Sequence, residues 1–219
     1  MTTRYPLVSA ACVAVLALSL GGCKTKGDIV VDEGVGVAAV RGACPSVGVP
    51  DYTGDITLFK TPGASDVASL DLTAAMTNVR STCNDASEKV YTTVSFDVLA
   101  RRTQTAGART VQLPYFVTVL RGGKAVVSKR VGTVTIAFAD GQERAQARAQ
   151  GGAYIDKSEA TLAPEIRARI TRKRKAGDSD AAIDPLALPE VKAAVARATF
   201  DLLVGFQLDD GQLAYNATR

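Results

Sequence analysis

The chain has 219 residues, of which 47% are hydrophobic and 22% charged, an ordinary composition for a globular protein with a single core. Its formal net charge of +4 is too small to imply a nucleic-acid partner. Histidine is absent, which excludes catalytic triads that pass through an imidazole and removes the commonest metal ligand. No S-x-x-K or G-x-S-x-G motif occurs. The sequence therefore predicts no enzyme, no cofactor and no metal site.

The chain begins with an export leader. Arg4 supplies one positive charge, and the apolar stretch from Leu7 to Leu20 that follows is too short to span a bilayer and typical of a signal peptide. The stretch ends in Leu20-Gly21-Gly22-Cys23, which resembles the lipobox of bacterial lipoprotein precursors. The resemblance implies that residues 1–22 are cleaved off and that the thiol of Cys23 carries lipid.

The same resemblance implies a location. Several acyl chains on one cysteine hold a protein to a membrane permanently, because each buried methylene contributes about 0.8 kcal/mol. Lys24 stands where an aspartate would, in this class, retain the protein at the inner membrane. We therefore expect anchoring in the outer membrane, on its periplasmic face, through the N-terminal lipid.

A tether and a disulfide come next. Residues 23–43 are rich in glycine and show no sustained hydrophobic period, as expected of a linker that lifts a domain off the bilayer. Cys12 leaves with the leader and Cys23 is lipidated, so Cys44 and Cys83 remain. In an oxidising compartment we expect these two to form a disulfide, which would remove about 4 kcal/mol of unfolded-chain entropy.

Alternation of apolar and polar residues predicts a series of strands, each with one buried face. It is clearest in the three ranges Ser69–Arg80, Val90–Ala100 and Thr110–Arg121. Gly122-Gly123 then predicts a tight hairpin turn. In the returning strand, 125–138, the phase of the apolar residues changes near Gly132, where we expect a β-bulge.

The second half of the chain is more varied. Residues 142–150 alternate alanine with arginine or glutamine, which fits a strand and an alanine-rich helix equally. If residues 162–172 are extended, Ile166 and Ile170 share one face and the basic side chains lie on the other. Pro189 is expected to begin a short helix, and residues 199–208 to form the last strand. Asp209-Asp210-Gly211 is interpreted as the turn that ends this strand rather than as a calcium site.

Seven or eight strands with one or two short helical inserts predict a mainly β fold: an antiparallel β-sandwich over residues 44–219. Its outline resembles the immunoglobulin and fibronectin type III sandwiches, although the buried tryptophan of antibody domains is missing. The strand–turn–strand segment 113–129, together with Cys44-Pro45, resembles uncharacterised envelope lipoproteins. That resemblance implies no activity.

One local cluster of charge is a candidate binding site. It consists of Arg167, Arg169, Arg172, Lys173, Arg174 and Lys175. A solvated surface explains such a run in most proteins, and contact with an anionic envelope polymer such as lipopolysaccharide is the sharper interpretation.

Three functional hypotheses follow from these features. The first is a non-catalytic envelope lipoprotein with a structural or partner-binding role in outer-membrane organisation. The second is a module that binds an anionic polymer through residues 167–175. The third, an enzyme, would need a cleft that holds a carboxylate pair of shifted pKa.

Overall fold

The computed structural model describes residues 42–61, 63–172 and 183–219, which belong to one compact unit, Ala39–Arg219. The leader, Cys23, the tether up to residue 41 and Lys173–Lys175 lie outside the described residues. None of the helices within those ranges is long and apolar enough to cross a membrane.

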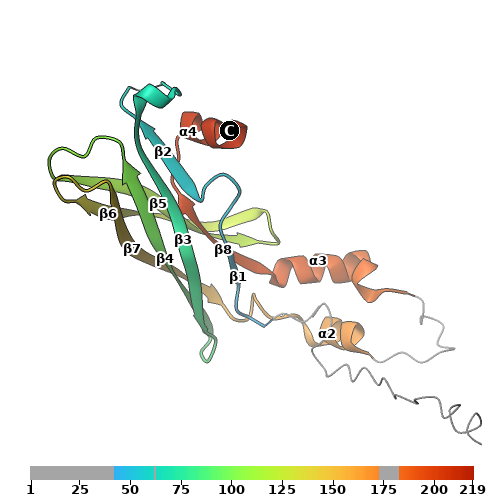
Figure 1. Cartoon of the computed structure of the whole chain (residues 1–219). Coiled ribbons are helices and arrows are strands. Elements are labelled where there is room, and N and C mark those ends of the chain that lie inside the picture. Colours follow the sequence, from blue (N-terminus) through green and yellow to red (C-terminus); the bar gives the residue numbers. More distant parts are fainter. Residues whose placement is uncertain (1–41, 62, 173–182) are drawn as a thin grey trace, which may run out of the picture. The chain divides into compact units, whose positions relative to one another are not determined.

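Two four-stranded sheets form the fold (Figure 1). Sheet A has the order β1 (Ser46–Gly48), β8 (Phe200–Phe206), β5 (Arg109–Arg121) and β6 (Ala125–Phe138). Sheet B has the order β2 (Asp55–Phe59), β3 (Leu70–Asn84), β4 (Lys89–Arg102) and β7 (Arg144–Asp156). All pairs are antiparallel except β1 with β8. The predicted mainly β sandwich is confirmed.

The core lies between the inner faces of the two sheets. Alternate residues of the predicted strands are buried there, among them Leu72, Ala74 and Met76 of β3, Val94, Phe96 and Val98 of β4, and Ile136 and Phe138 of β6. Each fully buried side chain of this size contributes about 1.5–3 kcal/mol relative to exposure. The period-2 pattern therefore identified the residues that hold the sheets together.

The hairpin prediction is confirmed, but the bulge prediction is wrong in position. Gly122 and Gly123 have φ of +61° and +75°, which suits glycine in a tight turn. The register shifts at Val127, not at Gly132. Gly132 pairs in register with Tyr115, and a Cβ atom on Gly132 would come within 2.6 Å of Cζ of the Tyr115 ring. The glycine provides room for that ring.

The open question at residues 142–150 is decided in favour of a strand. Residues 144–150 belong to β7 (Arg144–Asp156), which pairs with β4 along its whole length, and Gln142 and Glu143 precede the strand. Its alanines face inward and are half-buried, and a Cβ atom on Gly151 would come within 2.6 Å of Cγ2 of Val117 in the other sheet. Small residues in β7 therefore allow the two sheets to approach closely.

Three α-helices occur among the described residues, where one or two inserts were expected. They are α2 (Pro164–Thr171), α3 (Pro189–Ala198) and α4 (Asp210–Thr218). The helix from Pro189 is confirmed. The extended conformation considered for 162–172 is not the one adopted, because Pro164 occupies the first turn of a helix. Ile166 and Ile170, four residues apart and half-buried, share a face of α2.

The turn expected at Asp209-Asp210-Gly211 is instead the start of α4. Asp209 is the N-cap, and its carboxylate accepts a hydrogen bond from the backbone N–H of Gln212 at 2.7 Å. The Gln212 side chain in turn accepts one from the Asp209 N–H at 3.0 Å. This reciprocal capping box satisfies two backbone donors that would otherwise lack partners.

Candidate functional site

An open groove of about 920 Å³ lies on the outer face of sheet B. Thr73, Ala75 and Leu99 belong to its lining, and Leu99 is 48% exposed although it is large and apolar. Arg144 of β7 and Arg219, at the end of α4, also line the groove. The groove thus combines exposed apolar surface with guanidinium groups.

The groove depends on α4, which packs against the edge strand β2 (Figure 1). The buried amide of Asn216 donates hydrogen bonds to the backbone carbonyls of Tyr52 and Asp55, at 2.8 and 2.9 Å. Tyr215 meets the ring of Phe59 edge-on, with 5.2 Å between centroids. These contacts fix the helix beside the groove.

The charges around the groove do not cancel. Arg101 and Arg144 face each other directly across β4 and β7, an arrangement that is unfavourable for like charges. Arg101 forms an ion pair with Glu143, and its hydrogen bond lowers the pKa of that carboxyl. Arg219 forms an ion pair with Asp55. Arg144 also interacts electrostatically with Glu143, but its guanidinium has no hydrogen-bond partner among the described residues.

The ionisable side chains in the lining of the groove are mostly cations. The described lining residues include one carboxylate, Asp55, which is already paired with Arg219. Their other polar groups are hydroxyls, amides and guanidiniums. General acid–base catalysis needs a group that titrates near neutral pH, and this lining places no carboxylate pair together.

The basic cluster predicted from the sequence is only partly described. Arg167, Arg169 and Arg172 are exposed at α2 and its C-terminal end, and Lys173–Lys175 lie outside the described ranges. Arg169 donates to Oε1 of Glu190 on α3 at 2.8 Å. Residues two apart on a helix point in nearly opposite directions, so Arg167 and Arg169 do not share a face as they would on a strand.

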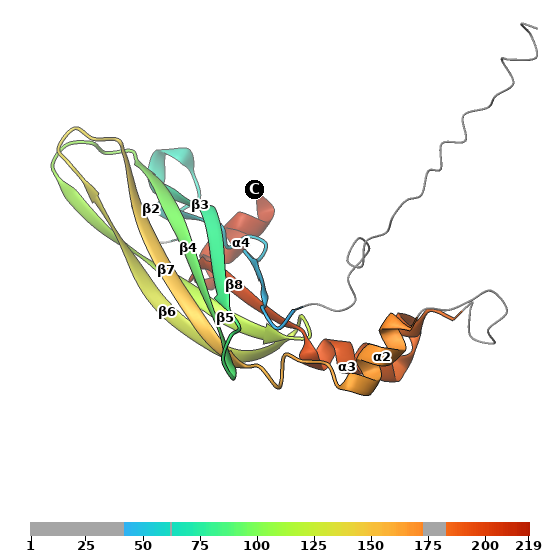
Figure 2. The ribbon, with the colours of Figure 1, turned by 90° about the horizontal axis from the view of Figure 1, so that it is seen from below.

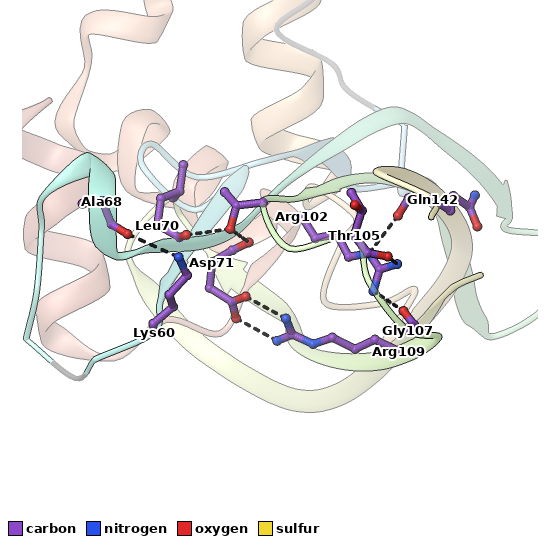
Figure 3. A network of polar contacts seen from close by, with 10 residues as sticks. Lys60, Ala68, Leu70, Asp71, Arg102, Thr105, Gly107, Arg109 and Gln142 are labelled. Carbon is purple, nitrogen blue, oxygen red and sulfur yellow. Dashed lines mark hydrogen bonds and ion pairs between the residues drawn. The ribbon is translucent and has the colours of Figure 1, made fainter. Parts of the chain in front are cut away.

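A buried arginine that the sequence analysis missed closes one end of the sandwich (Figure 3). Arg102 is 1% exposed, and its guanidinium donates hydrogen bonds of 2.6–2.8 Å to the carbonyls of Thr105, Gly107, Ala139 and Gln142. It also lies over the ring of Phe138, 5.2 Å from the centroid. Arg102 continues the series of inward-facing residues Val98 and Ala100, and this alternation was the feature of the sequence that indicated a buried side chain.

An ion pair supports the same end. Arg109 donates two hydrogen bonds of 2.7 Å to the carboxylate of Asp71, which joins β5 of sheet A to β3 of sheet B (Figure 3). This interaction lowers the pKa of Asp71 and raises the pKa of Arg109. Bidentate pairs of this kind fix geometry as well as charge.

The predicted disulfide between Cys44 and Cys83 is present, with a sequence separation of 39. Cys44 precedes β1 at the edge of sheet A, and Cys83 lies near the end of β3 in sheet B. The bond therefore joins the start of the described domain to the opposite sheet.

The described domain is thus a disulfide-linked β-sandwich that has a positively charged groove on one outer face. No family model, curated protein or solved structure matches the chain. In the parts of the chain that the structure describes, no group of three or more Cys, Asp or Glu side chains could hold a metal ion.

Proposed function

We propose that this chain is a lipid-anchored, non-catalytic protein of the bacterial envelope, held at the periplasmic face of the outer membrane. The observation that carries the proposal is Leu20-Gly21-Gly22-Cys23 at the end of a short apolar stretch. The Cys44–Cys83 disulfide supports it, since disulfides persist in oxidising compartments such as the periplasm.

The role proposed for the sandwich is to bind an envelope partner and so contribute to outer-membrane organisation. The groove beside α4 supports this role, because it exposes Leu99 next to the guanidinium of Arg144. A partner segment with apolar and acidic side chains would complement both groups.

The lipid anchor is tested by Cys23→Ser, with Cys12→Ser as the matched control. We expect the wild-type protein to incorporate labelled palmitate and to stay with membranes after a high-salt wash. Cys23→Ser should lose the label and enter the water-soluble fraction, whereas Cys12→Ser, which alters only the leader, should behave as wild type. A Cys23→Ser protein that remains salt-resistant on membranes would refute the proposal.

A second candidate function is binding of an anionic polymer through residues 167–175. The observation in its favour is the exposure of Arg167 and Arg172 directly before Lys173-Arg174-Lys175. Lipopolysaccharide binding should weaken steeply as ionic strength rises, and Lys173→Glu with Lys175→Glu should weaken it about ten-fold or more. Lys60→Glu, at an exposed site outside the patch, is the control. Salt-independent binding would contradict this mechanism.

A further inference from the structure

The β5–β6 hairpin exposes apolar side chains at the edge of sheet A. The first half of β6, residues 125–131, is exposed throughout, and Val126, Val127 and Val131 are 64%, 54% and 59% exposed. Among the described strands β6 pairs with β5 alone. The bulge at Val127 and the basic side chains of Lys129 and Arg130 hinder pairing of this edge with another strand, so the exposed valines mark a contact surface for something other than a strand.

Cations surround these valines. Lys124, Lys129 and Arg130 are exposed, and none has an ion-pair partner among the described residues. No aspartate or glutamate occurs from Arg121 to Phe138. Lys129 lies over the ring of Phe116, with Nζ 5.0 Å from the centroid. Valines bracketed by basic side chains match the boundary of an anionic bilayer, where apolar groups enter the interface and cations meet the headgroups.

The hairpin turn lies at the end of sheet A where the described chain begins. The N–H of Gly122 donates to the carbonyl of Thr199 at 2.9 Å, and Ser46 pairs with Asp201 two residues further along. The turn therefore lies close to β1, and Figure 2 shows it beside α3 at this end of the domain. Residues 24–43 span at most about 70 Å when fully extended, which limits the distance between Cys44 and a lipidated Cys23.

We propose that the β5–β6 hairpin is a second, reversible membrane contact, which lays Val126, Val127 and Val131 on an anionic lipid surface. This inference rests on the proposed function, because the anchor at Cys23 supplies the high local lipid concentration that makes a weak contact effective. A second copy of the chain is a poorer occupant, since it would bring Lys124, Lys129 and Arg130 against identical charges.

The test uses the full lipidated protein with an environment-sensitive dye on one introduced cysteine. Val127→Cys reports on the hairpin, and Val67→Cys, in the β2–β3 connection, is an exposed control outside the hairpin and the groove. The protein is reconstituted into vesicles of phosphatidylcholine alone or with about one third phosphatidylglycerol. We expect a blue shift and a several-fold intensity rise at position 127 in the anionic vesicles only, reversed by high salt, and no change at position 67.

The outcomes separate the anchor from the hairpin. The parent protein should take up no dye, because Cys23 is lipidated and Cys44 is bonded to Cys83. Labelling of Cys23 in the parent would overturn the proposed function. If the protein is anchored but the dye at position 127 shows no shift, the inference is wrong. A shift that depends on the density of protein on the vesicle rather than on lipid charge would indicate contact between copies and would also overturn the inference. Lys124→Glu with Arg130→Glu should abolish the shift.

Discussion

The two ends of β5 use the same basic residue types in opposite ways. At the Arg109 end, Arg102 is buried against four carbonyls and Arg109 is paired with Asp71. At the other end, about 40 Å away along the strand, Arg121 also makes internal contacts, with Glu159 and the ring of Phe200. Lys124 in the turn and Arg130, which pairs with Val117, are instead exposed and without an ion-pair partner among the described residues. The difference lies in which acceptors the fold brings near, not in the charge itself.

The largest effect should come from the disulfide, which joins the two sheets at the end of the sandwich away from Arg102. Replacing both Cys44 and Cys83 with alanine should lower the free energy of unfolding by about 4 kcal/mol, because the unfolded chain regains the entropy of a long closed loop. Denaturant titration measures this loss. Reduction of the wild-type protein should reproduce most of it, and a loss below about 1 kcal/mol would contradict the entropic argument.

Removal of the buried guanidinium comes next. Arg102→Leu should cost about 3 kcal/mol, because four carbonyls in two loops lose a charged donor. The matched control at the opposite end is Arg130→Leu, which should change stability by less than about 0.5 kcal/mol. If the two variants lost equal amounts of unfolding free energy, the proposed difference between the two regions would be wrong.

Gly132 leaves space that the ring of Tyr115 occupies. Gly132→Ala should cost about 2 kcal/mol, since its Cβ atom would overlap the Tyr115 ring. Thr133→Ala, at an exposed neighbour, is the control. In a Tyr115→Val background the cost of Gly132→Ala should fall sharply, and double-mutant cycles would detect that coupling. Additive losses would indicate that the ring does not cause the effect.

The smallest effect concerns Asp71, whose pKa is lowered in the fold by the hydrogen bonds from Arg109. A lowered pKa means that the pair stabilises the fold above the ordinary carboxyl value and that this contribution is lost as the pH falls toward the folded pKa. Asp71→Asn should cost about 1 kcal/mol at neutral pH and reduce the loss of stability below about pH 4. If Asp71→Asn loses as much stability at acidic pH as the wild type does, this assignment is wrong. Asp51→Asn, at an exposed site, serves as the neutral-pH control.

Local patterns predicted the strands well because burial on one face imposes alternation directly on the sequence. They failed where the deciding contact is distant. The role of Gly132 depends on Tyr115 in the neighbouring strand, and the alternation of Ile166 with Ile170 fits a helix face as well as a strand face. The groove beside α4 combines residues from four strands and a helix, so no spacing in the chain could have revealed it. Other missed signals are entirely local: the capping box at Asp209, the proline in the first turn of α2, and the inward phase of Arg102.

The position of Cys44 also decides how mechanical load would pass through the domain. Tension arriving along the backbone from residue 43 divides at this residue: one path continues into β1 and its parallel partner β8, and the other crosses the sulfur bridge into β3. A strand of three residues would be peeled away by modest force on its own. The covalent branch diverts that pull to a fifteen-residue strand in the other sheet, so the short edge is protected from unzipping.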